Sequence, residues 1–371
     1  MKIALTHDHL FQLGGAERVL MELHNIFPDS PVYTLIHNPE KAGIFKDLKI
    51  KTSFLEKLPF GKKHFKWYLG LMPIAWESFN FSEYDIVISS SSAFAKGLLT
   101  PPNTLNISYC HSPTRYLWSD THNYVDELKQ PKIIKKLLPL ILNRLRTWDH
   151  VAAQRVDKFI ANSEFVAKRI KKYYQRDSTV IYPPVDTKQF KISPEIGDYY
   201  IIVSRLRPYK KVDMVIKAFN QLRMPLKIIG SGEEEAKLKK MSSSNIEFLG
   251  ELSDEKRNQV LSKALAFIHP QEEDFGIAAV EAMACGRPVI AYKSGGALET
   301  IIENETGIFF VDQTWESLAD TIIRNHKKLD QFSPEKIKAH AEKFDTEVFH
   351  KKIKDFVSQT WQEFSGKTLQ L

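Results

Sequence analysis

Several features are scarce or missing in this chain of 371 residues, and each absence removes a class of protein. Its only two cysteines, Cys110 and Cys285, lie far apart and have no partner at metal-ligand spacing. We therefore expect neither a disulfide framework nor a zinc site. No run of 18 or more uncharged apolar residues occurs, so we expect no transmembrane helix. The first residues lack the long apolar stretch of a secretory signal, which favours a cytoplasmic protein.

Charge is abundant but unevenly placed. Hydrophobic residues make up 43% and charged residues 26% of the chain, as in ordinary soluble proteins, and the length predicts two or three domains. Residues 1–190 have 26 Lys and Arg against 18 Asp and Glu, whereas the remainder is nearly neutral. Such asymmetry indicates an anionic partner, which could be nucleic acid, a membrane surface or a phosphorylated substrate. A solvated lysine-rich surface explains the charge equally well.

The second half has the clearer rhythm of apolar segments. Helical patterns such as VDMVIKAFNQL and DEKRNQVLSKA lie between short strand-like runs, and this alternation predicts a parallel sheet. The expected strands are 200–206, 226–229, 246–249, 266–269, 288–292 and 308–311.

The first half repeats the pattern less regularly, with expected strands at 2–8, 31–36, 84–89, 106–110 and 158–161. YPPVDTKQF at 182–190 resembles a proline-containing hinge. We therefore expect two doubly wound α/β domains, 1–182 and 183–346, facing across a ligand-binding cleft. An amphipathic helix in 347–371 is expected to pack back on the first domain.

Two stretches of the first half depart from this rhythm. FLEKLPFGKKHFKWYLGLMPIAWESF at 54–79 mixes lysines with aromatics, and KQPKIIKKLLPLILNRLRTW at 129–148 is basic and rich in leucine. Such segments can lie in a membrane interface, which predicts peripheral contact between the first domain and an anionic membrane. The alternative is that they cover the sheet and direct their lysines to water.

The strongest chemical signal is EDFGIAAVEAMACGRPVIAY, which begins at Glu273. Glu273 follows a predicted strand, and Glu281 lies on the helix that begins near Gly276. A helix amino terminus offers unpaired N–H groups and partial positive charge, and therefore attracts anions. A carboxylate beside it can accept hydrogen bonds from the vicinal hydroxyls of a sugar.

This E-x7-E segment resembles the signature of retaining glycosyltransferases of family 4, which have the GT-B fold. Further similarities occur in the family's order along nearly the whole chain: GGAER at 14–18, YPPVDTKQF at 182–190, SRLRPYKKVD at 204–213 and GSGEEE at 230–235. The chain has no Asp-x-Asp, the usual metal-diphosphate signature of the other large glycosyltransferase fold. The resemblance thus implies metal-independent sugar transfer.

The resemblance also implies roles for individual residues of the second domain. Arg205 and Lys210 would hold the donor diphosphate, a task that suits an Arg fork and a Lys point charge. Glu281 resembles the acid that binds ribose hydroxyls, and Glu273 the acid that contacts the donor sugar. The backbone amides expected against sugar or phosphate belong to Phe275, Gly276 and Ile277.

In the first domain, Gly14 and Gly15 open a helix and would let backbone approach a ligand closely. His111 lies in HSPTRYLW, which resembles H-[ST]-P-x-R-Y-x-W of mannosyltransferase-like family members. There the histidine reaches the donor sugar from the opposite domain. Arg115 is a candidate for phosphate or acceptor binding. The sequence His7-Asp8-His9 looks like a metal cluster, but Asp8 would face away from both imidazoles, so we expect no metal there.

The resemblance predicts transfer of a hexose, with mannose favoured, from a nucleoside-diphosphate sugar to the hydroxyl of a glycan or lipid-linked acceptor. GDP-sugar is the favoured donor and UDP-sugar the alternative; no cofactor and no nucleic-acid partner are expected. Front-face substitution with retention is the expected mechanism. The competing functions are a sugar-nucleotide epimerase or hydrolase of the same fold, a non-catalytic sugar-nucleotide-binding protein, and an NAD-dependent oxidoreductase. The last is disfavoured because G-S-G at 230–232 lacks the third glycine of a dinucleotide fingerprint.

Overall fold

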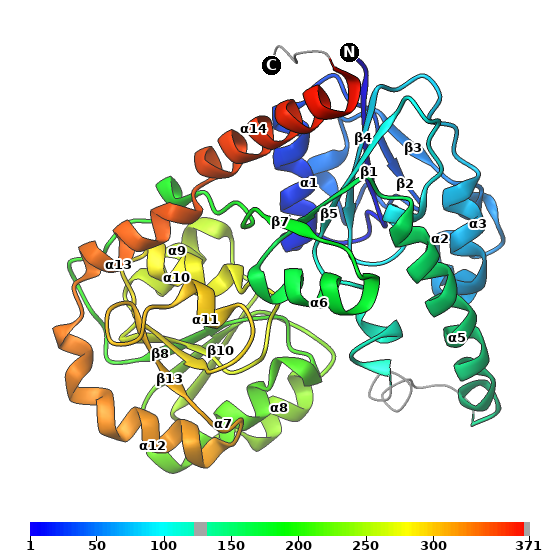
Figure 1. Cartoon of the computed structure of the whole chain (residues 1–371). Helices are drawn as coiled ribbons and strands as arrows, with labels where there is room; N and C mark the ends of the chain where they lie inside the picture. The colour runs from blue at the N-terminus through cyan, green and yellow to red at the C-terminus, as the bar shows by residue number, and fades with distance from the viewer. Residues whose placement is uncertain (122–131, 367–371) are drawn as a thin grey trace. The chain divides into compact units, whose positions relative to one another are not determined.

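The computed structural model describes residues 1–121 and 132–366 and divides into two compact units (Figure 1). Unit 1 contains Met1–Pro184 together with the chain from Phe349 onward, and unit 2 is Val185–Val348. The chain passes from unit 1 to unit 2 between Pro184 and Val185, inside the proline-containing segment 182–190.

Unit 1 is built on a seven-stranded parallel sheet in the order β3-β2-β1-β4-β5-β6-β7. The chain moves outward from β1 in one direction and then resumes beside β1 with β4, so the order reverses between these two strands. The strands are β1 (Ile3–His7), β2 (Val32–Thr34), β3 (Ile50–Thr52), β4 (Ile86–Ser91), β5 (Leu105–Cys110), β6 (Lys158–Ala161) and β7 (Ser178–Val180).

Helices flank the sheet of unit 1. In the first of them, α1 (Gly15–Ile26), the buried residues Val19, Leu20 and Leu23 lie on one face, as expected of an amphipathic helix. The others are α2 (Gly61–His64), α3 (Met72–Glu77), α5 (Lys132–Gln154) and α6 (Glu164–Tyr174), with the 3₁₀ helices η1 (Gly43–Phe45), η2 (Phe54–Lys57), η3 (Phe65–Leu71), η4 (Ala95–Gly97) and η5 (Arg115–Leu117).

The last helix, α14 (Thr346–Ser365), supplies part of the hydrophobic core of unit 1. Its buried residues Phe349, Ile353 and Val357 belong to the cluster that contains Ile3 and Leu5 of β1. The chain therefore returns to unit 1 after completing unit 2, and the buried face of α14 is part of the core of unit 1.

Unit 2 has a six-stranded parallel sheet in the order β10-β9-β8-β11-β12-β13, which reverses between β8 and β11. Its strands are β8 (Tyr200–Val203), β9 (Leu226–Ile229), β10 (Ile246–Gly250), β11 (Ala266–His269), β12 (Val289–Tyr292) and β13 (Gly307–Phe310). Its helices are α7 (Val212–Leu222), α8 (Glu235–Met241), α9 (Asp254–Ser262), α10 (Ile277–Ala284), α11 (Ala297–Thr300), α12 (Trp315–Asn325) and α13 (Pro334–Ala341), with η6 (Thr187–Gln189), η7 (Pro208–Lys210), η8 (His326–Gln331) and η9 (Glu342–Phe344).

The two sheets confirm the expected α/β class with two Rossmann-like units, and each expected strand corresponds to an observed one. The strands β3 and β7 were not predicted; both have three residues and lie at the edges of the first sheet. The segment 129–148 forms the first part of α5, although residues 129–131 lie outside the described ones.

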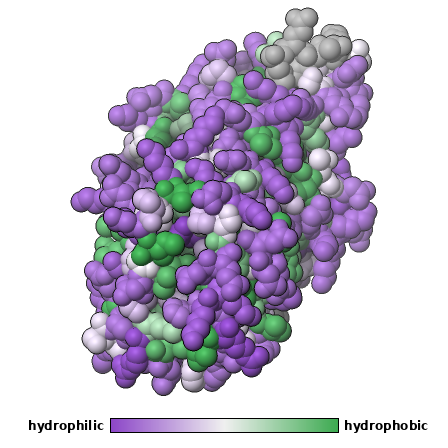
Figure 2. Space-filling view, turned by 90° about the vertical axis from the view of Figure 1, so that its left-hand side faces the viewer, coloured by the Kyte–Doolittle hydropathy of each residue, from purple (hydrophilic) through white to green (hydrophobic). Residues whose placement is uncertain are grey.

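Within the described ranges 1–121 and 132–366, no helix has the length and apolarity needed to cross a membrane. Hydrophilic residues predominate on the face that Figure 2 shows, where hydrophobic residues form small separate patches. Scattered exposed hydrophobic residues of this kind are normal on folded proteins.

Candidate functional site

In unit 2, the expected site residues Lys210 and Glu273 lie in contact although 63 positions separate them. Lys210 ends η7, which follows β8, and Glu273 lies in the loop after β11. Because β8 and β11 are neighbours at the reversal of strand order, their carboxyl ends bring both loops to one place. Lys210 Nζ donates a hydrogen bond to Glu273 Oε1. The side chains are 17% and 20% exposed, so the ion pair remains accessible.

Glu273 is held as an ionised carboxylate. Burial alone raises the pKa of Glu273, but the charge of Lys210, the neighbouring imidazole of His269, and hydrogen bonds from Lys210 and Gln271 lower that pKa to about 2. Gln271 Nε2 donates to Glu273 Oε1 at 2.9 Å. At neutral pH this group therefore accepts hydrogen bonds and carries no proton to donate.

Glycines fix the loop that carries Glu273. Gly276 caps α10 with a φ of +94°, which favours glycine, and a Cβ there would lie 3.3 Å from His269 Cε1. A Cβ on Gly295 would lie 2.4 Å from the backbone oxygen of Glu273, and Gly296 N donates to that same oxygen at 2.8 Å. The loop after β12 thus packs directly against the loop after β11.

His269, at the end of β11, was not expected from the sequence as a site residue. It is 1% exposed, and neither of its ring nitrogens has a hydrogen-bond partner among the described residues. Burial lowers the pKa of His269 below its usual value, and this effect exceeds the rise in pKa that the charge of Glu273 causes. An uncharged, unpaired imidazole therefore lies beside Gly276 and the Lys210–Glu273 pair.

The other expected residues of unit 2 lie in the loops after β8 and β11 and on α10. Glu281 is 4% exposed on α10, and its Oε1 lies 3.9 Å from Nη2 of Arg257. Arg205 lies in the loop after β8, and its backbone oxygen accepts a hydrogen bond from Ser204 Oγ at 3.1 Å. Phe275 is buried edge-on against Phe344, with 5.5 Å between ring centroids. Gly276 and Ile277 form the start of α10.

In unit 1, the expected residue His111 lies in a buried set of polar side chains. His111 directly follows β5, and its Nε2 forms a 2.8 Å hydrogen bond with Ser90 Oγ on β4. Ser90 Oγ is also 3.0 Å from Nδ1 of His7, which ends β1. Burial, together with the nearby imidazole of His7, lowers the pKa of His111 to about 3, so this side chain is neutral at physiological pH.

Gly14 and Gly15 lie where the sequence predicts, at the start of α1: Gly14 is the N-cap and has extended backbone, with a φ of −153°. Arg115 begins η5, and its Nε donates to Asp120 Oδ2 at 2.8 Å. Asp8 of the His-Asp-His sequence accepts four backbone N–H bonds from residues 92–95, at 2.6 to 2.9 Å. Within the described part of the chain there is no cluster of three or more side chains suited to a metal.

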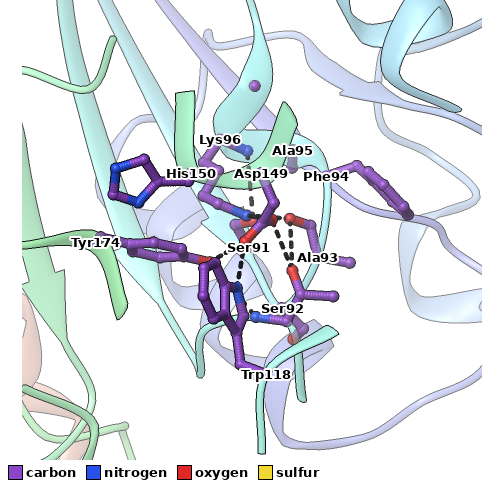
Figure 3. Close-up of polar contacts among 12 residues, drawn as sticks. Ser91, Ser92, Ala93, Phe94, Ala95, Lys96, Trp118, Asp149, His150 and Tyr174 are labelled. Atoms are coloured by element: carbon purple, nitrogen blue, oxygen red, sulfur yellow. Dashed lines mark hydrogen bonds and ion pairs between the residues drawn. The ribbon is translucent and has the colours of Figure 1, made fainter. Parts of the chain in front are cut away.

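A second buried network fixes the segment that follows His111 (Figure 3). Asp149 of α5 accepts hydrogen bonds from Lys96 Nζ at 2.5 Å, Thr114 Oγ1 at 2.9 Å, Trp118 Nε1 at 2.8 Å and Tyr174 OH at 2.8 Å. The sequence motif HSPTRYLW therefore contains two residues, Thr114 and Trp118, that serve as anchors to α5. Neither Lys96 nor Asp149 was expected from the sequence, because each resembles an ordinary charged residue there.

Comparison with known proteins gives a consistent result. A model described as Glycosyltransferase Family 4 matches residues 13–189, and one described as Glycosyl transferases group 1 matches residues 186–357. The alpha-1,3/1,6-mannosyltransferase ALG2 of Kluyveromyces lactis is 25% identical over 94% of this chain and 84% of its own length. A GDP-mannose-dependent monoacylated alpha-(1-6)-phosphatidylinositol monomannoside mannosyltransferase of Corynebacterium glutamicum is 36% identical over 32% of this chain and 35% of its own length.

Solved structures show the same fold. Anabaena HepE in complex with UDP-glucose matches with a TM-score of 0.73 and 19% identity, over 97% of this chain and 100% of that chain. Sucrose-phosphate synthase of Thermosynechococcus elongatus matches with a TM-score of 0.70 and 15% identity, over 98% and 100% of the two chains.

Proposed function

Because the chain belongs to the family 4 glycosyltransferases, we propose that it moves a hexose, mannose in preference, from a nucleoside-diphosphate sugar to an acceptor hydroxyl with retention at the anomeric carbon. The observation that carries this proposal is the accessible Lys210–Glu273 pair beside the start of α10, at the strand reversal of unit 2. Such reversals are where open α/β sheets bind nucleotides.

Each member of the unit 2 site has a distinct task in this reaction. Lys210 and Arg205 neutralise the charge that grows on the leaving diphosphate, and the N–H groups at Phe275, Gly276 and Ile277 assist them. Glu273, ionised because its pKa is about 2, accepts hydrogen bonds from the sugar hydroxyls. Glu281 accepts those of the ribose. The proton of the acceptor hydroxyl passes to the leaving phosphate oxygen as the new glycosidic bond forms on the same face.

GDP-mannose is the favoured donor. The HSPTRYLW stretch resembles mannosyltransferase-like sequences, and two relatives have mannosyltransferase names, one of which includes GDP-mannose. UDP-sugar is the alternative, since the similar HepE fold was crystallised with UDP-glucose. A thermal-shift screen of GDP-, UDP- and ADP-sugars tests this choice. Stabilisation by a UDP-sugar without an effect of GDP-mannose would reverse it.

Product analysis with radiolabelled donor then tests transfer itself. Label in an extended glycan or lipid-linked acceptor supports the proposal, whereas free or epimerised sugar made without acceptor would indicate a hydrolase or epimerase. Arg205→Ala combined with Lys210→Ala should abolish transfer while the protein stays folded. Full activity of this double variant would refute the role assigned to the two cations.

We also propose peripheral contact with the cytoplasmic face of an anionic membrane, where a lipid-linked acceptor would lie. The support is in unit 1: Phe60 and Trp67 are each 67% exposed, with ring centroids 6.4 Å apart, in a lysine-containing segment. Exposed aromatics among lysines suit a bilayer interface. The double variant Phe60→Ser/Trp67→Ser should sediment less with phosphatidylglycerol vesicles than the wild-type protein does. Ile323→Ser, a change of a 63% exposed residue on α12, is the matched control and should have no effect.

A further inference from the structure

Four polar side chains form a continuous buried row across three neighbouring strands and one helix of unit 1. Glu17 of α1 has its Oε1 3.8 Å from Nε2 of His7, an ion-pair contact longer than a hydrogen bond. His7 Nδ1 lies 3.0 Å from Ser90 Oγ, which lies 2.8 Å from His111 Nε2. We call these four residues, Glu17, His7, Ser90 and His111, the histidine row.

The register of the sheet produces this alignment. His7 and Ser90 are direct partners in the pairing of β1 with β4, and His111 follows β5, which pairs with β4 on its other side. All four side chains are buried, with residue exposures of 4% for Glu17, 3% for His7, 0% for Ser90 and 8% for His111. Burying polar groups costs free energy unless they are hydrogen-bonded, so the orientation of each one constrains the next.

The negative charge of Glu17 attracts a protonated ring nitrogen and repels a lone pair, and this orders the protons along the row. When the His7 ring carries a single proton, the carboxylate 3.8 Å from Nε2 places that proton on Nε2, so His7 Nδ1 accepts from the Ser90 hydroxyl. The Ser90 oxygen can then only accept from its other neighbour, so His111 carries its proton on Nε2. The second nitrogen of His111, Nδ1, is left as an acceptor.

We propose that Glu17, His7 and Ser90 are positioning residues that fix the tautomer of His111, so that its Nδ1 accepts a hydrogen bond from a hydroxyl of the bound sugar. The role of His111 toward the sugar rests on the function proposed above, whereas the assignment of the His111 tautomer is independent of that function. Selection of one tautomer through the hydrogen bond of the opposite ring nitrogen is how histidine is commonly oriented in active sites. The pKa of Glu17 supports its ionised state: burial raises this pKa, but the contact with His7, a backbone hydrogen bond and the nearby His9 together bring it below its usual value.

The test uses the full chain labelled with ¹⁵N-histidine, with ¹⁵N–¹H correlation spectra recorded at pH 8. His111→Asn assigns the resonances of His111. The wild-type protein should show His111 protonated on Nε2 and unprotonated on Nδ1. Glu17→Gln, whose amide can donate as well as accept, removes the constraint, so both tautomers of His111 should appear. Ser90→Ala should release His111 in the same way, and adding Glu17→Gln to Ser90→Ala should cause no further change.

A matched control is available on the same helix. Glu22 of α1 also pairs with a histidine, with its Oε2 2.7 Å from His350 Nε2, but has no link to Ser90. Glu22→Gln should therefore leave the His111 resonances unchanged. A wild-type proton on Nδ1, or a His111 tautomer unaffected by both Glu17→Gln and Ser90→Ala, would overturn the proposal.

Kinetics with GDP-mannose separate this inference from the proposed function. Glu17→Gln should raise KM for the donor by roughly three- to tenfold, the equivalent of one weakened hydrogen bond, and Glu22→Gln should not. If the wild-type protein turns over no GDP-mannose, the proposed donor fails, while the spectra still decide whether the row fixes the tautomer. An unchanged KM in Glu17→Gln despite a mixed tautomer would overturn the link between the row and the sugar.

Discussion

Replacing Lys96 by Met should strongly destabilise unit 1, because it removes the only cation among the four donors to Asp149 (Figure 3). The two side chains are 2% and 0% exposed, and Nζ lies 2.5 Å from Oδ1. Lys96 Nζ also donates to the backbone oxygen of Ala93. Met retains the apolar stem of the lysine, so the change acts mainly on charge.

The size of the effect follows from burial. Breaking a buried ion pair by removing one partner costs about 3–5 kcal/mol, because the remaining charge is left uncompensated. Since Thr114, Trp118 and Tyr174 still donate to Asp149, we expect the lower end of this range, about 3 kcal/mol. Adding Asp149→Asn removes the isolated charge: the amide oxygen can accept from Trp118 and Tyr174, which donate to Oδ2, and the NH₂ group can donate to the hydroxyl oxygen of Thr114. The double variant should therefore recover at least about 1 kcal/mol relative to Lys96→Met.

Urea unfolding followed by tryptophan fluorescence can measure this change in unfolding free energy, because five of the six tryptophans belong to unit 1 and only Trp315 belongs to unit 2. The signal therefore reports mainly on unit 1. Lys171→Met removes the exposed pair between Lys171 of α6 and Asp177, which follows this helix, and should leave the midpoint unchanged. A loss below about 1 kcal/mol in Lys96→Met, or a double variant as unstable as the sum of the single ones, would refute the reasoning.

Three further predictions concern unit 2. The pKa of Glu273 is lowered from 4.5 to about 2, so its ionisation stabilises the fold above pH 4.5, and this stability is lost as the pH falls toward 2. The difference in unfolding free energy between wild type and Glu273→Gln should therefore shrink by about 3 kcal/mol over that window, as measured by urea unfolding at stepped pH. A constant difference would contradict this prediction. His269→Phe removes a buried imidazole without a described partner, so the unfolding free energy should stay equal or rise; a loss beyond about 1 kcal/mol would reveal a hidden partner. Gly276→Ala places a Cβ at a φ of +94° and should cost about 1–3 kcal/mol in thermal or urea unfolding, whereas an unchanged midpoint would show that the backbone relaxes.

Much of the fold is readable from the sequence because parallel strands buried on both faces give continuous apolar runs. The strands that were missed, Ile50–Thr52 and Ser178–Val180, lie at sheet edges, where burial on both faces is not required. Strand ends were also less well predicted: 200–206 was expected, but the strand stops at Val203, because Ser204 begins the turn that leads to Lys210. Turns and edges depend on neighbours that are distant in sequence.

The candidate site was predictable only in part, for the same reason. Glu273 and Lys210 stand out by resemblance, but their contact depends on β8 and β11 being neighbours, which follows from strand order and not from local pattern. Ser90 lies in a run of four serines, so nothing in the sequence distinguishes the one that joins two histidines. His269 likewise reads as the polar end of a strand.

The two units use the reversal of strand order in opposite ways. At the β8–β11 reversal, Lys210 and Glu273 form an accessible ion pair. Under the proposed function, the donor diphosphate replaces the carboxylate as the partner of Lys210. At the β1–β4 reversal, the titratable groups are buried, His7 and His111 both contact Ser90 Oγ, and His111 is neutral with a pKa of about 3. A neutral imidazole contributes little to a developing negative charge but can discriminate hydroxyl geometry. Under the proposed function, loss of His111 should therefore impair sugar selectivity more than diphosphate affinity, whereas loss of Lys210 should do the reverse. The affinities of His111→Asn and Lys210→Met for GDP alone and for GDP-mannose distinguish these two effects. Equal losses of affinity for both ligands in both variants would contradict this division.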